Sequence, residues 1–157
     1  MSRKYYLAYG SNLNVDQMLH RCPGAIKIGT ATLNGYRITF RGNSRSGVAN
    51  IEPRKGSSVP VGIWSITESD ERELDRYEGY PHLYYKETFM IKLPDLRTVP
   101  AIAYIMTPGR VWAQPSPYYL SIIKQGYKDF GFQPRNLLYA SRTPTTQASD
   151  ALLKERK

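Results

Sequence analysis

Glu78 is the side chain in this sequence whose position most favours proton-transfer chemistry. It lies four residues after Leu74, the apolar anchor of an expected helix, so the two side chains share one inward face. The C-terminal end of a helix carries partial negative charge and partial burial penalises a charged carboxylate, so both effects raise the pKa of Glu78. A carboxyl group with a pKa near neutrality can accept and return a proton. The alternative interpretation is a frayed helix end whose glutamate pairs with a nearby lysine or arginine.

A short helix is expected to hold this glutamate in place. Thr67 followed by Asp70 resembles a capping box, and Gly79 is a typical terminating residue. The helix should therefore begin at residue 68 and end at residue 77 or 78. Asp70 is expected to lie on its solvent face.

The second candidate element is the small-residue turn Gly10-Ser11-Asn12, which follows an expected strand over residues 4–9. Asn14 can then cap a short helix that ends at Pro23. A turn between a strand and a helix N-terminus leaves backbone N–H groups free, which favours an anion such as a substrate carboxylate or a phosphate. The further glycines and the lysine of a P-loop are missing, so a plain tight turn is the alternative.

The rest of the chain is rich in strand patterns. Asn34-Gly35 is the strongest hairpin signal, and residues 42–47 form a polar loop. Ser116 begins an amphipathic helix that ends near Gly131. Further strands are expected over residues 28–33, 36–41, 48–52, 59–66, 84–93 and 98–106, and a short helix over residues 136–141. These elements predict an α+β fold, either a curled and mainly antiparallel sheet or a small β-barrel, flanked by helices.

The length and composition favour one compact domain. The chain has 157 residues, of which 41% are hydrophobic. We expect the domain to span residues 1–141, followed by a polar C-terminal tail over residues 142–157. No segment approaches the roughly 18 apolar residues of a membrane helix, and the N-terminus lacks a signal-peptide core, so a cytoplasmic protein is expected. Cys22 is the single cysteine, which excludes an internal disulfide, and we expect it to be buried rather than nucleophilic.

The net charge of +9 favours anionic partners through the general electrostatic field. The basic residues, Arg37 and Arg41 among them, are spread along the chain without the dense block typical of a nucleic-acid-binding domain. A small-molecule partner is therefore preferred to nucleic acid. The 13 tyrosines would permit base stacking, but packing at the edge of the core is the preferred interpretation.

Two motifs, taken together, resemble a known enzyme family. Tyr9-Gly10-Ser11-Asn12-Leu13, followed at a distance by Tyr77-Glu78-Gly79-Tyr80-Pro81-His82-Leu83-Tyr84, is similar to the γ-glutamylcyclotransferases, including the members named for an avirulence-induced gene. The resemblance extends to about Ala140, and residues 115–120 resemble the helix that closes the fold in bacterial members. It implies a small barrel-like domain without a metal or organic cofactor. It also implies an enzyme that splits a γ-glutamyl compound into 5-oxoproline and a free amino acid or amine.

The resemblance implies that Glu78 is the catalytic residue. In a γ-glutamyl compound the α-amino group can attack its own γ-carbonyl, so one carboxyl group that takes a proton from the ammonium and returns it to the leaving amine is sufficient. A tyrosine after the acidic motif is also implied; Tyr84 fits the spacing, whereas Tyr85 is the alternative. The expected substrate-binding residues, through backbone amides or hydroxyl groups, are Tyr9, Gly10, Ser11, Asn12, Leu13 and Tyr84.

Three further side chains receive weaker interpretations. Tyr119 is a candidate for closing the pocket, although core packing is preferred. His20 and His82 have no partners at metal-ligand spacing, so no metal site is expected. The competing functions are another acyl transfer or cleavage at a γ-glutamyl amide, and a non-catalytic protein on the same scaffold that binds a small molecule or nucleic acid.

Overall fold

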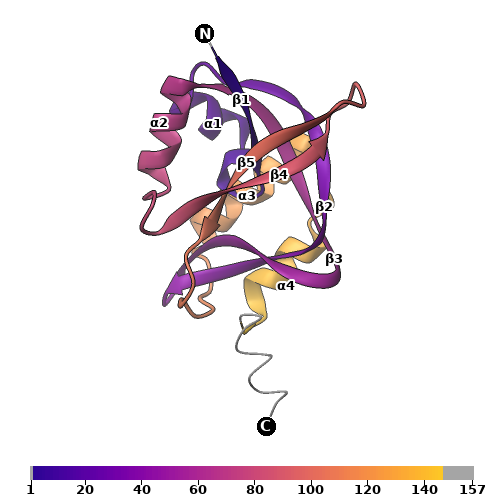
Figure 1. The fold of residues 1–157 in the computed structure, drawn as a ribbon. Coiled ribbons are helices and arrows are strands. Elements are labelled where there is room, and N and C mark those ends of the chain that lie inside the picture. Colours follow the sequence, from indigo (N-terminus) through magenta and orange to yellow (C-terminus); the bar gives the residue numbers. More distant parts are fainter. Residues whose placement is uncertain (1, 147–157) are drawn as a thin grey trace.

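The computed structural model describes residues 2–146, which form one five-stranded mixed sheet with helices around it (Figure 1). The strand order is β2-β3-β1-β5-β4. The strands are β1 (Arg3–Ala8), β2 (Ile26–Asn43), β3 (Ser46–Thr67), β4 (Tyr84–Lys92) and β5 (Thr98–Met106). The helices are the 3-10 turn η1 (Ser11–Leu13), α1 (Val15–Arg21), α2 (Glu68–Tyr77), α3 (Pro117–Phe130) and α4 (Arg135–Arg142).

The expected curled sheet is confirmed, but the barrel alternative is wrong because the sheet is not closed. β2 and β4 are its two edges and pair with each other nowhere in the described residues. Side chains of the two edges do meet, since the rings of Tyr36 and Phe89 lie edge to face with their centroids 5.5 Å apart. β1 lies in the centre, antiparallel to β3 and parallel to β5. One parallel pair therefore makes the sheet mixed.

The predicted hairpin at Asn34-Gly35 is wrong. β2 continues through this point and stays paired with β3, which Figure 1 shows as a long, strongly bent ribbon. Gly35, at φ +81°, lies in an irregularity of the ladder, opposite residues 54–57 of β3. The positive φ that favours a hairpin turn also permits a bulge, and here it bends the ribbon. The actual turn lies inside the predicted polar loop, where Asn43 pairs with Ser46.

The four strands predicted over residues 28–33, 36–41, 48–52 and 59–66 merge into the two long strands β2 and β3. The predicted helices and the strands β1, β4 and β5 are confirmed close to their expected limits. β4 and β5 form an antiparallel hairpin, and Ser116 caps α3 by accepting from the amide of Tyr119. α3 packs directly on the turn after β1: a Cβ added to Gly126 would lie 2.6 Å from the backbone nitrogen of Asn14. Only glycine allows this approach, so the helix supports the turn from behind.

The domain boundary at residue 141 remains a prediction. α4 ends at Arg142, one residue into the predicted tail, and residues 147–157 of that tail lie outside the described residues. Among residues 2–146, no helix combines the length and the hydropathy that crossing a bilayer requires.

Candidate active site

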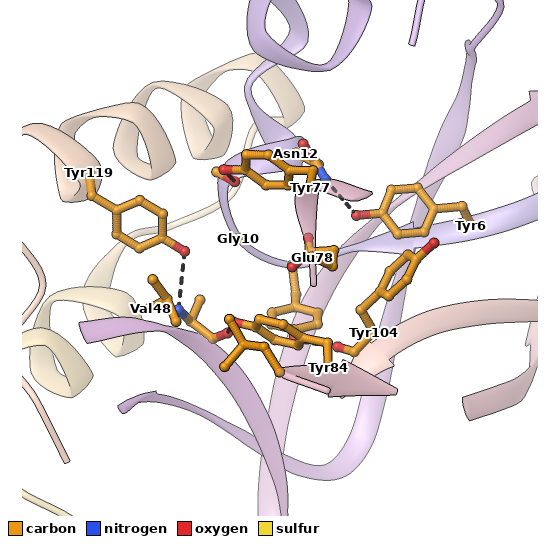
Figure 2. Close-up of a pocket in the computed structure, with 13 residues that line it drawn as sticks. Tyr6, Gly10, Asn12, Val48, Tyr77, Glu78, Tyr84, Tyr104 and Tyr119 are labelled. Atoms are coloured by element: carbon orange, nitrogen blue, oxygen red, sulfur yellow. Dashed lines mark hydrogen bonds between the residues drawn. The ribbon is translucent and has the colours of Figure 1, made fainter. Parts of the chain in front are cut away.

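A cavity of about 270 Å³ lies between the turn after β1 and the C-terminal end of α2. Figure 2 shows Glu78 in the middle of a group of tyrosine side chains, beside the turn at Gly10. Motifs more than 60 residues apart in the sequence therefore share one pocket. The lining residues are Tyr6, Tyr9, Gly10, Ser11, Asn12, Val48, Ala49, Tyr77, Glu78, Leu83, Tyr84, Tyr104 and Tyr119.

α2 places Glu78 at the pocket in the way its local sequence predicts. The side chain of Thr67 accepts from the amide of Asp70, whose carboxylate accepts in turn from the amide of Thr67, so the capping box is complete. Glu78 is the C-cap residue and donates its amide to Leu74 at 2.8 Å, after which Gly79 adopts φ +62°. Glu78 lines the cavity, so the prediction that its side chain faces inward is confirmed.

Asp70 was expected to reach water, but it does not. It is 3% exposed, and besides capping α2 it accepts from the amide of Gly24 at 3.2 Å. The carboxylate therefore joins the start of α2 to the segment that follows α1. The sequence signal for a cap was correct, but the capping side chain also has a tertiary partner.

The carboxyl group of Glu78 has an environment suited to proton transfer. The residue as a whole is partly exposed because it borders an open pocket, yet protein replaces most of the water around its carboxyl group. This burial raises the pKa of Glu78 to about 7, and the positive charge of Arg21 opposes part of the rise. The alternative of a glutamate paired with a neighbouring lysine or arginine finds no support, because no salt bridge of the described residues includes Glu78.

The turn after β1 is held rigidly beside this carboxyl group. The side-chain amide of Asn12 donates to the hydroxyl of Tyr6 at 2.9 Å, and its backbone carbonyl accepts from the indole of Trp64 at 3.1 Å. The hydroxyl groups of Ser11 and Tyr77 lie 3.0 Å apart. The amides of Ser11 and Asn12 belong to the first turn of η1, where intrahelical acceptors are lacking, so they are the groups in this turn available to a ligand.

Leu13 differs from the other residues of the predicted binding turn. Its side chain is fully buried in the core and does not line the cavity. Its amide donates to the carbonyl of Gly10 at 3.0 Å, which closes η1. Both the side chain and the amide of Leu13 therefore already serve the fold, and a role of Leu13 in substrate binding remains a prediction from the sequence.

Two of the predicted tyrosines fix the pocket wall by hydrogen bonds to one peptide segment. The hydroxyl of Tyr84 donates to the carbonyl of Ala49 at 2.6 Å, whereas that of Tyr119 accepts from the amide of Ala49 at 3.1 Å. Tyr84, which was preferred for its spacing in the motif, lines the cavity, whereas the alternative Tyr85 does not. Tyr119, for which core packing was preferred, also borders the cavity. The hydroxyl of Tyr9 donates to the carbonyl of Tyr104 at 2.5 Å, so it is already occupied.

Sequence reasoning missed two tyrosines of the wall. Tyr6 and Tyr104 meet edge to face at 5.9 Å, and both line the pocket. Tyr6 lies two positions before Ala8, the last residue of β1, and the parallel pairing of β1 with β5 brings the ring of Tyr104 beside it. Alternation along β1 was the available signal for Tyr6; nothing local predicted that parallel pairing.

No lysine or arginine is among the residues that line the cavity, so a bound carboxylate would depend on backbone amides and hydroxyl groups. Residues 2–146 contain no group of three or more histidine, cysteine, aspartate or glutamate side chains able to hold a metal ion. Cys22 is fully buried, and burial raises the pKa of its thiol to about 12. A thiol that stays protonated at neutral pH is a poor nucleophile.

Comparison with known proteins agrees with this arrangement. The family model described as gamma-glutamyl cyclotransferase, AIG2-like, matches residues 6–126. The chain belongs to the γ-glutamylcyclotransferase family. Human gamma-glutamylcyclotransferase is 30% identical over 135 residues, which cover 80% of this chain and 71% of the relative. The bovine gamma-glutamylcyclotransferase is 28% identical over the same length and coverage.

Solved structures show the same fold. One described as a gamma-glutamyl cyclotransferase superposes with a TM-score of 0.77 at 23% identity, covering 99% of this chain and 100% of the other. Because relatives named gamma-glutamylcyclotransferase are about 30% identical to this chain, the protein is an enzyme of this family. The matched region includes both the turn after β1 and Glu78.

Proposed function

We propose that this enzyme converts a small γ-glutamyl amino acid or γ-glutamylamine into 5-oxoproline and the free amino acid or amine, with Glu78 as the general acid and base. The observation that carries the proposal is the position of Glu78: one carboxyl group with a pKa of about 7 borders the same cavity as the turn after β1. Family membership supports the class of activity. The substrate and the role of Glu78 are the proposed parts.

The reaction begins with proton transfer to Glu78. The substrate α-ammonium gives one proton to the carboxylate, and the resulting amine forms a bond to the carbon of its own γ-carbonyl. A five-membered ring with a tetrahedral carbon results. Glu78 then returns the proton to the departing nitrogen as the bond between that nitrogen and the γ-carbon breaks. The second proton of the new ring nitrogen passes to the released amine, so the products are 5-oxoproline and the amine in its ammonium form, and no water is consumed.

The turn after β1 supplies the hydrogen-bond donors for the negative charges of the substrate. The amides of Ser11 and Asn12 point from the start of η1, and the hydroxyl group of Ser11 lies within the cavity wall. They would bind the α-carboxylate or the negative charge that develops on the γ-carbonyl oxygen. Because the bonds of Asn12 to Tyr6 and Trp64 hold this turn in place, its donors need no rearrangement at the moment of reaction.

A substrate panel tests the proposal. The purified protein is incubated with γ-glutamyl amino acids, γ-glutamylamines and glutathione, and 5-oxoproline is measured together with the released amine. We expect equal amounts of the two products from at least one compound. Hydrolysis to glutamate would indicate attack by water instead of the substrate's amine. Absence of 5-oxoproline throughout the panel would overturn the proposal.

The pH dependence of kcat/KM should follow the ionisation of Glu78. The carboxylate form must be present to accept the ammonium proton, so kcat/KM should rise with pH through a midpoint of about 7. The rise follows from loss of a proton by an acid whose pKa lies above its ordinary value of 4.5. Initial rates at low substrate concentration across this range measure it. A midpoint near 4.5, with a flat profile above it, would contradict a base in a water-poor site.

A further inference from the structure

Arg21, the last residue of α1, contacts both parts of the active site without lining the cavity. Its guanidinium donates to the side-chain oxygen of Asn12 in the turn after β1. The same guanidinium lies over the ring of Tyr77, with its central carbon 3.4 Å from the ring centroid. Tyr77 directly precedes Glu78, so one side chain of α1 touches the binding turn and the end of α2.

These contacts connect Arg21, the turn after β1 and the end of α2 to one another. The hydroxyl groups of Tyr77 and Ser11 lie 3.0 Å apart, so the end of α2 and the turn are joined directly as well as through Arg21. The turn is thus held on two sides, at Ser11 by a hydroxyl group and at Asn12 by the guanidinium. A planar guanidinium can donate in its plane and stack on a ring at the same time, which a lysine ammonium cannot do.

Arg21 also supplies a charge that acts on Glu78. Several other ionisable side chains influence Glu78 or face the same cavity, and burial keeps the pKa of each ring hydroxyl above its usual value, so they stay neutral. These are Tyr6 of β1, Tyr9 directly after it, Tyr84 of β4, Tyr104 of β5 and Tyr119 of α3. Tyr77 is the remaining neighbouring hydroxyl. Arg21 is the cation that lowers the pKa of Glu78.

We propose that Arg21 is a positioning residue of the reaction, which holds the turn at Asn12 against Tyr77 and sets the electrostatic surroundings of Glu78. The kinetic part of this inference rests on the proposed function. Without the guanidinium, the contact between Ser11 and Tyr77 would be the remaining side-chain link from the turn to the end of α2, so the separation between the donors of the turn and the carboxyl group would be less closely fixed. A displacement of about 1 Å in an active site can reduce the rate about 100-fold.

Two substitutions separate the geometric effect from the charge effect. Arg21→Met removes both, so kcat/KM should fall about 10- to 100-fold and the midpoint of its pH profile should move to higher pH. The direction follows because loss of a nearby positive charge favours the neutral carboxyl group. Arg21→Lys keeps the charge but loses the planar contact with Tyr77, so kcat should fall while the midpoint stays close to that of the parent.

Arg76→Met is the matched control. Arg76 lies two residues before Glu78, but its side chain is 74% exposed and pairs with Glu73 outside the cavity. The substitution Arg76→Met removes one positive charge close to Glu78 in the sequence. Both kcat and the midpoint of the pH profile should be unchanged. Equal pH midpoints in the parent, Arg21→Met and Arg76→Met would overturn the proposal, because a purely structural role would lower activity without moving the midpoint.

A measurement that needs no turnover keeps this inference separate from the proposed function. The glutamate side-chain carboxyl carbons are labelled with carbon-13, the Glu78 signal is assigned by its loss in Glu78→Gln, and its titration is followed by NMR. The midpoint should be higher in Arg21→Met than in the parent. An unmoved midpoint would overturn the role of Arg21 even if the enzyme is active, whereas a shifted midpoint without 5-oxoproline from the parent would overturn only the proposed function.

Discussion

Glu78→Gln is expected to reduce 5-oxoproline formation by at least about 100-fold, because general acid and base catalysis typically contributes about 100- to 10,000-fold. Glutamine has nearly the same shape but cannot accept the proton of the substrate's ammonium. Substrate affinity should change little, since the proposed donors to the substrate lie in the turn after β1. Rates measured over a range of substrate concentrations would therefore show a lower maximum with an almost unchanged half-saturation concentration.

Stability measurements distinguish this loss from unfolding. The pKa of Glu78 is raised in the folded protein, so the unfolded chain loses this proton at lower pH than the native state does. Stability therefore falls as pH rises from about 4.5 to about 7. The glutamine of Glu78→Gln does not ionise, so the variant does not lose this stability as pH rises. At pH 8 it should therefore unfold at the same temperature as the parent or at a higher one. Glu73→Gln, on the exposed face of α2, should keep full activity. An active Glu78→Gln would refute the proposed mechanism.

The parts of the site that could be predicted are those with local signals. The helix that carries Glu78 is defined within a dozen residues by the capping box at Thr67 and by Gly79, and the inward direction of Glu78 follows from its spacing to Leu74. The turn at Gly10 is similarly local. The resemblance then joined these two segments, which no periodicity could place in one pocket.

The parts that could not be predicted depend on tertiary pairing. Tyr104 reaches the cavity because β5 pairs in parallel with β1, and Arg21 contacts Asn12 and Tyr77 behind the cavity wall because α1 packs beside α2. Asn34-Gly35 is the opposite case: its local signal for a turn is strong, but continued pairing of β2 with β3 outweighs it. Arg41, which as a charged residue is expected at the surface, is 1% exposed.

The buried position of Arg41 is possible because Glu52 accepts from it through both carboxylate oxygens. The second bond, from Nη2, is 3.0 Å long, and Thr39 donates to the same carboxylate at 2.9 Å. Burial opposes ionisation of Glu52, but the guanidinium of Arg41 and the hydroxyl of Thr39 hold its pKa below the usual value. Arg37 adds a longer contact of 3.5 Å. The carboxylate therefore joins the β2–β3 ribbon from inside.

Glu52→Ala is expected to destabilise the protein by about 3–5 kcal/mol, because it leaves the guanidinium of Arg41 buried without its charged partner. For a chain of this size, that loss should lower the melting temperature by about 6–20 °C. Glu73→Ala removes an exposed pair with Arg76 and should lower stability by less than about 1 kcal/mol. The double substitution Arg41→Met with Glu52→Leu should recover much of the loss, since no buried charge then remains. Equal melting temperatures for Glu52→Ala and Glu73→Ala would contradict this account of the ribbon.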